Sequence, residues 1–337
     1  MSDVKLSICI PTYNFGQFIG EAVESVRKQY VPGTELVILD SASTDDTRDV
    51  VARLQIECPY IHYHLQPFKG GIDADMERCV ALAEGKYCWL LSADDALLDG
   101  ALSRIHDEID SARDVYLCNR MLCDKNLKPL HPQSWLRGNF GDFDVDLAEE
   151  QALFQYYERA TSVGALFSYM SAIIFRRESW NRSTADPALT GTNYAHIHRL
   201  FNMRSFQARM KYLAAPLVLC RGNNDSFLSL GVLGRHLIDL RGFHLIAQLL
   251  FPDDARLRTR FKEVVNREHH WVTWVWLRSI TDDDIEWQKI RRALPDYGYG
   301  RLTILAIEYL ASMPHGVTCA HILHNVTSRI FARPGNA

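Results

Sequence analysis

Basic residues are not in excess in this sequence. The chain of 337 residues has 37 Lys and Arg against 41 Asp and Glu, so its formal net charge is −4. A protein whose main partner is nucleic acid normally carries a basic face. We therefore expect no nucleic acid partner for this chain.

Long apolar runs are also missing, and we expect no signal peptide. No uninterrupted apolar stretch reaches the length that spans a bilayer, and the first residues enter an apolar strand without the pattern of a signal peptide. Eight cysteines occur without CxxC spacing, and Cys9 and Cys88 lie inside apolar runs. These features predict a cytoplasmic protein with reduced, buried thiols.

The first third of the chain alternates short β-like runs with helical patterns, which is typical of a parallel sheet covered by helices. We expect strands at 4–10, 35–39, 60–65, 86–91 and 114–118, and helices at 17–29, 43–56, 70–85 and 99–109. Ser43 suits the N-cap of the second helix and Gly85 the C-cap of the third. Because the carboxyl ends of parallel strands meet at one edge, we expect ligands to bind there.

The remainder of the chain is less regular at first and then helical. Residues 119–158 indicate irregular structure with a helix near 147–159, strands are expected at 171–175 and 211–220, and nearly everything beyond 233 has a helical pattern. This predicts two domains, 1–230 and 231–337. Apolar residues at 302–313 and 317–331 each form one helical face, which indicates either core packing or a peripheral seat on a membrane.

Two adjacent acids, Asp94 and Asp95, follow the apolar run 86–91. Adjacent carboxylates at the end of a buried strand are costly unless a cation lies beside them. A hard divalent cation is held in many sites by one or two carboxylates, with substrate phosphates completing its oxygen shell. The doublet therefore predicts a nucleotide-sugar site, and the alternative is a solvated acidic turn that caps the helix from Asp99.

Four sequence motifs occur in order: LSICIPTYN at 6–14, LVILDSASTD at 36–45, AEGKY at 83–87 and SADD at 92–95. Together they resemble the family-2 glycosyltransferases. The resemblance implies an α/β fold of the GT-A (Rossmann-like) type, with a mostly parallel sheet flanked by helices and a helical C-terminal region. Within the family, the phrases GIDAD at 71–75, YCWLLS at 87–92 and NDSF at 224–227 are similar to O-antigen transferases of the abequosyltransferase type.

The resemblance also implies roles for individual residues. Three of them would lie against the nucleotide base, namely Pro11, Thr12 and Tyr13, and Asp40 would accept a hydrogen bond from the base ring. Asp94 or Asp95 would bind Mg²⁺ or Mn²⁺ between the two phosphates. Ser92 stands where the family often has Asp, so which acid binds the metal and which meets the ribose stays open.

Three further residues are expected near the donor. Arg221 and Asn224 belong to a polar loop of the kind that closes over the diphosphate in this family, although such residues are also common in turns. Asp73 opens a helix and either helps to bind the donor or complements the helix dipole. Tyr13 has a structural alternative as well, packing on Phe15.

An inverting transferase needs a base that takes the proton of the acceptor hydroxyl. Many relatives use an acid from a Glu-Asp pair, but residues 189–200 contain no such pair. His196 is the expected base because imidazole accepts protons near neutral pH, and Asp186 is the alternative. A lone histidine on a helix is also often structural.

These features favour a metal-dependent, inverting transfer of a hexose or dideoxyhexose from a nucleoside-diphosphate sugar to a lipid-linked glycan. The subfamily resemblance favours a CDP-linked donor. The apolar faces at 302–313 and 317–331 would suit a seat on the inner face of the cytoplasmic membrane, and a homo-oligomer stays open. One alternative is a nucleotidyltransferase, which usually has a basic, glycine-rich loop after its first strand, whereas residues 11–16 contain one glycine and no basic residue. The other is a non-catalytic protein that binds nucleotide sugars.

Overall fold

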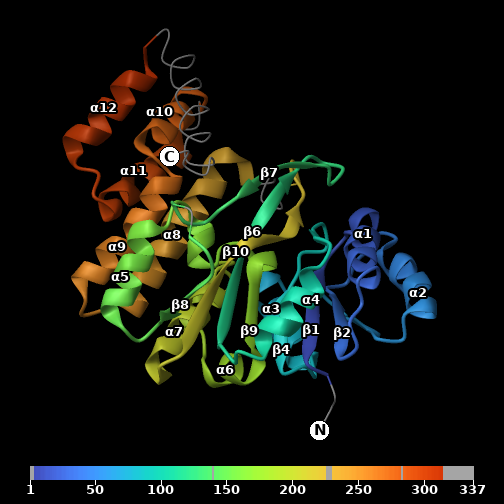
Figure 1. Cartoon of the computed structure of the whole chain (residues 1–337). Helices are drawn as coiled ribbons and strands as arrows, with labels where there is room; N and C mark the ends of the chain where they lie inside the picture. The colour runs from blue at the N-terminus through green and yellow to red at the C-terminus, as the bar shows by residue number, and fades with distance from the viewer. Residues whose placement is uncertain (1–3, 139, 225–229, 282–283, 314–337) are drawn as a thin grey trace. The chain divides into compact units, whose positions relative to one another are not determined.

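The computed structural model describes residues 4–138, 140–224, 230–281 and 284–313. The chain divides into two compact units (Figure 1). The first comprises the described residues of Met1–Ser134, Phe140–Ala152 and Phe167–Asn224, and the second those of Trp135–Asn139, Leu153–Leu166 and Asp225–Ala337. The division of function at residue 230 stays a prediction.

The first unit is built on one mixed sheet. Its strands are β1 (Leu6–Thr12), β2 (Thr34–Asp40), β3 (Ile61–Leu65), β4 (Tyr87–Leu90), β5 (Ala96–Leu97), β6 (Val115–Cys123), β7 (Pro129–Gln133), β8 (Phe143–Asp146), β9 (Ile173–Arg176) and β10 (Arg209–Cys220). The order is β3-β2-β1-β4-β9-β6-β10-β5, with β7 on β6 and β8 on β10. β1, β2, β3, β4, β6 and β10 run in one direction and the others oppose them, which confirms a mostly parallel α/β sheet.

Helices cover this sheet. They are α1 (Gly16–Arg27), α2 (Thr47–Glu57), α3 (Ile72–Leu82), α4 (Ala101–Ile109), α6 (Arg177–Arg182) and α7 (Ala195–Asn202). α1 and α2 contact each other, whereas α3 packs on β1 and β2. Right-handed crossovers place α3 on the face opposite to α1 and α2, because β2 and β4 flank β1 on different sides. Seven cysteines among the described residues are free thiols, and six of them are buried as expected: Cys9, Cys58, Cys79, Cys88, Cys118 and Cys123. The seventh, Cys220 at the end of β10, is only half-buried.

Some local expectations were wrong. α2 begins at Thr47, and the hydroxyl of Ser43 instead accepts a hydrogen bond from the Asn14 amide (2.8 Å). α3 ends at Leu82, so Gly85 is not its C-cap. Gly85 is needed for close packing instead, because a Cβ there would lie 2.5 Å from the Ser7 hydroxyl. β5, β7 and β8 were not predicted. β5 has only two residues, and β7 and β8 are short strands in which few residues are buried.

The second unit is helical, as expected for the described residues beyond 233. It contains the end of α5 (Glu150–Arg159) and the helices α8 (Gly231–Leu250), α9 (Ala255–Glu268), α10 (Trp271–Ser279), α11 (Asp284–Ala293) and α12 (Arg301–Ala311). Its core includes Trp274, Trp287, Phe243 and Phe261. Among the described residues, no helix combines the length and the apolar character that crossing a membrane requires.

The predicted apolar face of α12 does not lie in the core of this unit. Leu302 is 82% exposed, Tyr309 is 64% exposed, and Leu305 between them is also exposed. Ile304 and Ile307 face inward instead. The core interpretation of this face is therefore wrong for the described residues, and the second stretch, 317–331, lies outside them.

Candidate active site

The acidic doublet lies between two strands of the sheet. β4 ends at Leu90, and the two residues of β5 pair antiparallel with the end of β10. Asp94 is 8% exposed and Asp95 is 3% exposed. α4 begins only at Ala101, with Gly100 as its N-cap, so the alternative of a solvated acidic cap is wrong.

Asp95 is held by three hydrogen bonds. The hydroxyls of Tyr169 and Ser171 both donate to its Oδ2 at 2.6 Å, and the backbone amide of Arg221 donates to Oδ1 at 3.1 Å. Burial, followed by the charge of Asp94, raises the pKa of Asp95 to about 6. A second negative charge in a buried site thus disfavours the ionised form of this carboxyl.

Asp94 is oriented by two side chains. The Ser92 hydroxyl donates to its Oδ1 at 2.5 Å, and the Asn224 amide donates to its Oδ2 at 2.7 Å. The departure from the family motif at Ser92 thus supplies a neutral donor in place of an acid. Asn224, one of the expected donor-site residues, lies at the doublet; Asp225, the next residue of its motif, lies outside the described residues.

Arg221 also lies at the doublet, but it binds protein groups. Its Nε donates to the backbone oxygen of Asp94 (2.8 Å), its Nη1 to the backbone oxygen of Lys125 (2.7 Å) and its Nη2 to Glu21 (2.5 Å). Its Cζ lies 4.6 Å from the ring centroid of Phe18. In this structure the guanidinium joins the segments of Glu21 and Lys125 to the doublet. Its contact with the nucleotide-sugar substrate stays a prediction.

The carboxylates of Asp94 and Asp95 fit a divalent cation whose remaining coordination positions are filled by the substrate. Within the described part of the chain, neither Asp94 nor Asp95 forms an ion pair. The basic side chain at the doublet, Arg221, forms its salt bridge with Glu21 instead. No group of three or more His, Cys, Asp or Glu that could hold a metal occurs among those residues. Two buried carboxylates held by neutral donors suit a hard cation whose other ligands are phosphates and water, but not an all-protein cage.

The predicted base-binding residues lie at the carboxyl ends of β1 and β2. Pro11 and Thr12 are buried, and Tyr13 is half-buried beneath Lys69, whose Nζ lies 4.0 Å from the ring centroid. Asp40 is fully buried, and its two oxygens accept hydrogen bonds from the Ser43 amide (2.7 Å) and the Tyr63 hydroxyl (2.6 Å).

The contacts of Tyr13 bear on its structural alternative, packing on Phe15. Phe15 packs on Phe18, at 6.0 Å between ring centroids, and the described contacts of Tyr13 include Lys69 instead. Lys69 had no signal in the sequence, because a lysine in a loop is ordinary. The base contacts of Tyr13 and Asp40 stay predictions.

Asp73 has a role that neither interpretation of the sequence included. Its carboxylate accepts hydrogen bonds from the amides of Asn193 (2.9 Å) and Ala195 (3.2 Å), at the start of α7. Burial raises the pKa of Asp73, against the effect of these bonds. Asp73 therefore joins the first turn of α3 to the first turn of α7, and its contact with a donor stays a prediction.

The two expected bases have different surroundings. His196 is 5% exposed, its Nε2 donates to the backbone oxygen of Phe167 (2.9 Å), and its Nδ1 is buried without a partner among the described residues. Burial lowers the pKa of His196 to about 4. Asp186 is half-buried and accepts a hydrogen bond from the Ala188 amide (2.9 Å) at the start of a 3₁₀ helix. In this conformation, His196 presents no nitrogen to an acceptor hydroxyl.

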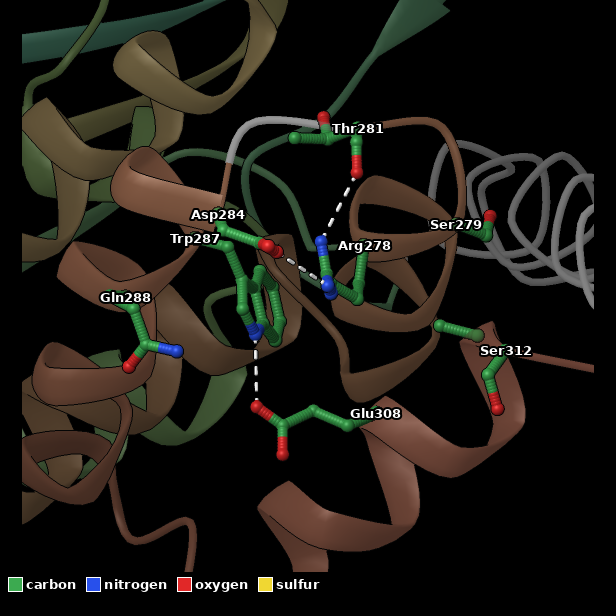
Figure 2. A pocket seen from close by; sticks show the side chains of 9 residues that line it. Arg278, Ser279, Thr281, Asp284, Trp287, Gln288, Glu308 and Ser312 are labelled. Atoms are coloured by element: carbon green, nitrogen blue, oxygen red, sulfur yellow. Dashed lines mark hydrogen bonds and ion pairs between the residues drawn. The ribbon is translucent and has the colours of Figure 1, made fainter.

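A separate pocket of about 520 Å³ lies among the helices of the second unit (Figure 2). Four of its side chains form two pairs: Arg278 donates to Asp284 (2.7 Å), and the indole of Trp287 donates to Glu308 (3.0 Å). None of the residues that the sequence predicted for the site lines this pocket.

The comparison with protein families decides the identity of the fold and its chemistry. Residues 7–182, just over half of the chain, match the model of glycosyl transferase family 2. The chain belongs to glycosyltransferase family 2. This glycosyltransferase carries the β1, β2 and β4 motifs and the acidic doublet inside the matched region, and the family membership decides against the nucleotidyltransferase and the non-catalytic alternatives.

Relatives cover the glycosyltransferase to different extents. It is 29% identical to abequosyltransferase RfbV of Salmonella typhimurium over 96% of this chain and 99% of that protein. It is 35% identical to a GalNAc(5)-diNAcBac-PP-undecaprenol beta-1,3-glucosyltransferase of Campylobacter jejuni, over 30% of this chain and 33% of the relative. The similarity to RfbV therefore includes the C-terminal region, whereas the second similarity covers less than a third of the chain.

Two solved structures share the fold. S. aureus TarS in complex with UDP-GlcNAc superposes with a TM-score of 0.65 at 20% identity, covering 91% of this chain and 90% of that one. A mannosyltransferase from Pyrobaculum calidifontis in complex with GDP-Man and Mn²⁺ gives a TM-score of 0.54 at 15% identity, covering 97% and 85%. These likenesses confirm the GT-A fold of the glycosyltransferase.

Proposed function

We propose that this glycosyltransferase moves a hexose of the 3,6-dideoxy type from a CDP-linked sugar to a hydroxyl of a lipid-linked, O-antigen-type glycan, with inversion. The main observation in support of a nucleotide-sugar site is the buried Asp94–Asp95 doublet at the sheet edge, whose carboxylates accept hydrogen bonds from uncharged groups. The similarity to RfbV over nearly the whole of both chains supports the sugar and the acceptor class.

Asp94 and Asp95 would hold Mg²⁺ or Mn²⁺ in this proposal. A bound divalent cation supplies positive charge that stabilises the leaving diphosphate. Ser92 and Asn224 fix the carboxylate of Asp94, and the Arg221 side chain fixes the backbone that carries it. The Mn²⁺ in the mannosyltransferase complex supports the choice of metal.

The nucleotide would lie beside β1 and β2, with the base on Pro11, Thr12 and Tyr13. Asp40 would accept a hydrogen bond from the base, which in cytosine comes from the 4-amino group of the ring. Tyr63 and the Ser43 amide already fix both oxygens of Asp40, so this carboxylate is preorganised, and each oxygen keeps a lone pair for a further donor. Lys69, which lies over the ring of Tyr13, brings a positive charge to the same edge.

Transfer would proceed as a single displacement. The acceptor oxygen bonds to the anomeric carbon while the bond from that carbon to the diphosphate oxygen breaks, and a base takes the hydroxyl proton. Asp186 and His196 are the two proposed bases. The accessibility of Asp186 supports it, whereas His196 would have to leave its hydrogen bond to Phe167 before it could act.

The exposed apolar face of α12 supports a peripheral seat on the inner face of the cytoplasmic membrane, where a lipid-linked acceptor resides. Sedimentation with vesicles of phosphatidylethanolamine and phosphatidylglycerol tests this contact. A Leu302→Ser/Tyr309→Ser variant should sediment less than the wild type. Ile56→Ser, which removes an equally exposed apolar side chain from α2, is the matched control, and equal sedimentation of all three proteins contradicts the seat. A homo-oligomer also stays open.

The central experiment is a nucleotide panel. Thermal unfolding is measured with CDP, UDP, GDP and dTDP, each with Mn²⁺ and with EDTA, and CDP with Mn²⁺ should raise the midpoint most. Asp95→Ala should remove the Mn²⁺-dependent part of this shift and abolish transfer from the donor. Unchanged turnover by this variant refutes the role of the doublet, and a larger shift with another nucleotide refutes the CDP preference.

A further inference from the structure

We propose that Tyr169 and Ser171 are positioning residues of the donor site, whose hydroxyls fix Asp95 so that it can bind a metal–diphosphate. The inference rests on the proposed function, because it specifies how one carboxylate of the doublet is held. Neither residue belongs to the motifs of the sequence. Both come to the site through the 3₁₀ helix at Met170–Ala172, just before β9.

The first reason is that both hydroxyls converge on one atom. They donate to Oδ2 of Asp95 at 2.6 Å each, whereas Oδ1 accepts one hydrogen bond, from the Arg221 amide at 3.1 Å. A carboxylate oxygen has two lone pairs, so Oδ2 is saturated and Oδ1 keeps a lone pair. The pair of hydroxyls therefore fixes the rotation of the carboxylate and leaves Oδ1 available to a cation.

The second reason is that the donors are neutral. A lysine or arginine at the same place would neutralise Asp95 and compete with a cation for it. The two side-chain donors here are a phenol and an aliphatic hydroxyl, both uncharged when they donate. The hydroxyls thus hold Asp95 without neutralising the negative charge of the doublet, which stays available to a bound cation.

The third reason is that each hydroxyl is itself held. Ser171 is fully buried; its Oγ accepts a hydrogen bond from the Ser92 amide (2.9 Å), and its backbone oxygen accepts one from the indole of Trp89 (2.8 Å). The guanidinium carbon of Arg120 lies 4.4 Å from the ring centroid of Tyr169. These contacts hold both hydroxyls in place before a ligand arrives, which is what preorganisation of a binding site requires.

The test compares Tyr169→Phe, Ser171→Ala and the double variant with wild type by calorimetric titration of CDP, with Mn²⁺ and with EDTA. Each single change should weaken Mn²⁺-dependent CDP binding about threefold to tenfold, the usual effect of one hydrogen bond. The double change should exceed the product of the two, because either hydroxyl alone can hold Oδ2. Binding of CDP in EDTA should stay unchanged.

Matched controls separate positioning from general stability. Ser179→Ala removes a serine hydroxyl that also donates to a carboxylate at 2.6 Å, that of Asp114, and Tyr212→Phe removes a buried phenol that bonds Asn119 (2.9 Å). Both should lower the unfolding midpoint without changing Mn²⁺-dependent binding. Tyr169→Phe keeps the ring against Arg120, so it carries the test by itself if Ser171→Ala does not fold.

The outcomes distinguish this inference from the proposed function. If wild type binds none of CDP, UDP, GDP and dTDP more tightly with Mn²⁺, the proposed donor site fails and takes this inference with it. If wild type shows Mn²⁺-dependent binding and the Tyr169 and Ser171 variants match it, only this inference is overturned. Equal weakening in Mn²⁺ and in EDTA also overturns it, because the hydroxyls would then support the fold alone.

Discussion

His196 should make the protein sensitive to acid. Its side chain is buried, it donates to the backbone oxygen of Phe167, and burial lowers its pKa to about 4. An unfolded chain returns the pKa of histidine to about 6.5. Between these values the unfolded state binds the proton more tightly, so the stability contributed by neutral His196 is complete above pH 6.5 and is lost as the pH falls towards 4.

The size of the effect follows from this pair of values. For one group with pKa values of about 4 folded and about 6.5 unfolded, the free energy of unfolding falls by about 2 kcal/mol between pH 7 and pH 5. His196→Gln retains an amide donor that can reach the Phe167 oxygen but takes up no proton. Urea unfolding at pH 7, 6 and 5 should therefore show wild type losing about 2 kcal/mol more than His196→Gln over this interval.

His131→Gln is the control, because this histidine is exposed on β7 and its surroundings change little on unfolding. Its pH profile should follow that of wild type. Parallel profiles for wild type and His196→Gln would refute the buried, neutral state of His196. The same variant tests the sequence-based prediction of a catalytic base: that role requires kcat to collapse, whereas a buried structural role leaves kcat within about threefold of wild type.

Three further predictions follow from named contacts. If Asp186 is the base, Asp186→Asn should lower kcat at least a hundredfold with little change in donor KM, and an unchanged kcat excludes it. Arg221→Lys keeps the charge but loses the fork of hydrogen bonds, so Mn²⁺-dependent CDP affinity in calorimetry should fall about tenfold; retained affinity contradicts its role at the doublet. Gly85→Ala should lower the free energy of unfolding, measured in urea, by about 2 kcal/mol because the added Cβ would meet Ser7. Gly141→Ala is the control and should leave the free energy of unfolding unchanged, because the space around Gly141 is open.

The alternation of strand and helix up to residue 118 was predictable because it is local. Periodic apolar residues bury one face of each element, and the strands that result deliver Asp40 and the Asp94–Asp95 doublet to one edge of a parallel sheet. The predicted boundaries failed where a side chain bonds to a distant part of the chain. Ser43 serves the loop after β1, and Gly85 makes room for Ser7.

The partners of the doublet could not be predicted in the same way. Tyr169 and Ser171 lie more than seventy residues from Asp95, and their positions depend on β9 inserting between β4 and β6. Arg221 was noticed as part of a polar loop, but only the pairing of β5 with β10 brings its amide to Asp95. His196 was chosen for its chemistry, while its burial depends on the backbone oxygen of Phe167.

By itself, the sequence determined the family, the α/β class and the acids that reach the sheet edge, because short motifs and the periodicity of apolar residues are local features of the sequence. The tertiary structure decided which hydroxyls hold Asp95, which histidine nitrogen is buried and which apolar face of α12 stays exposed. Those outcomes depend on contacts between segments far apart in the chain, and hydrogen bonds and burial of this kind leave no pattern in neighbouring residues.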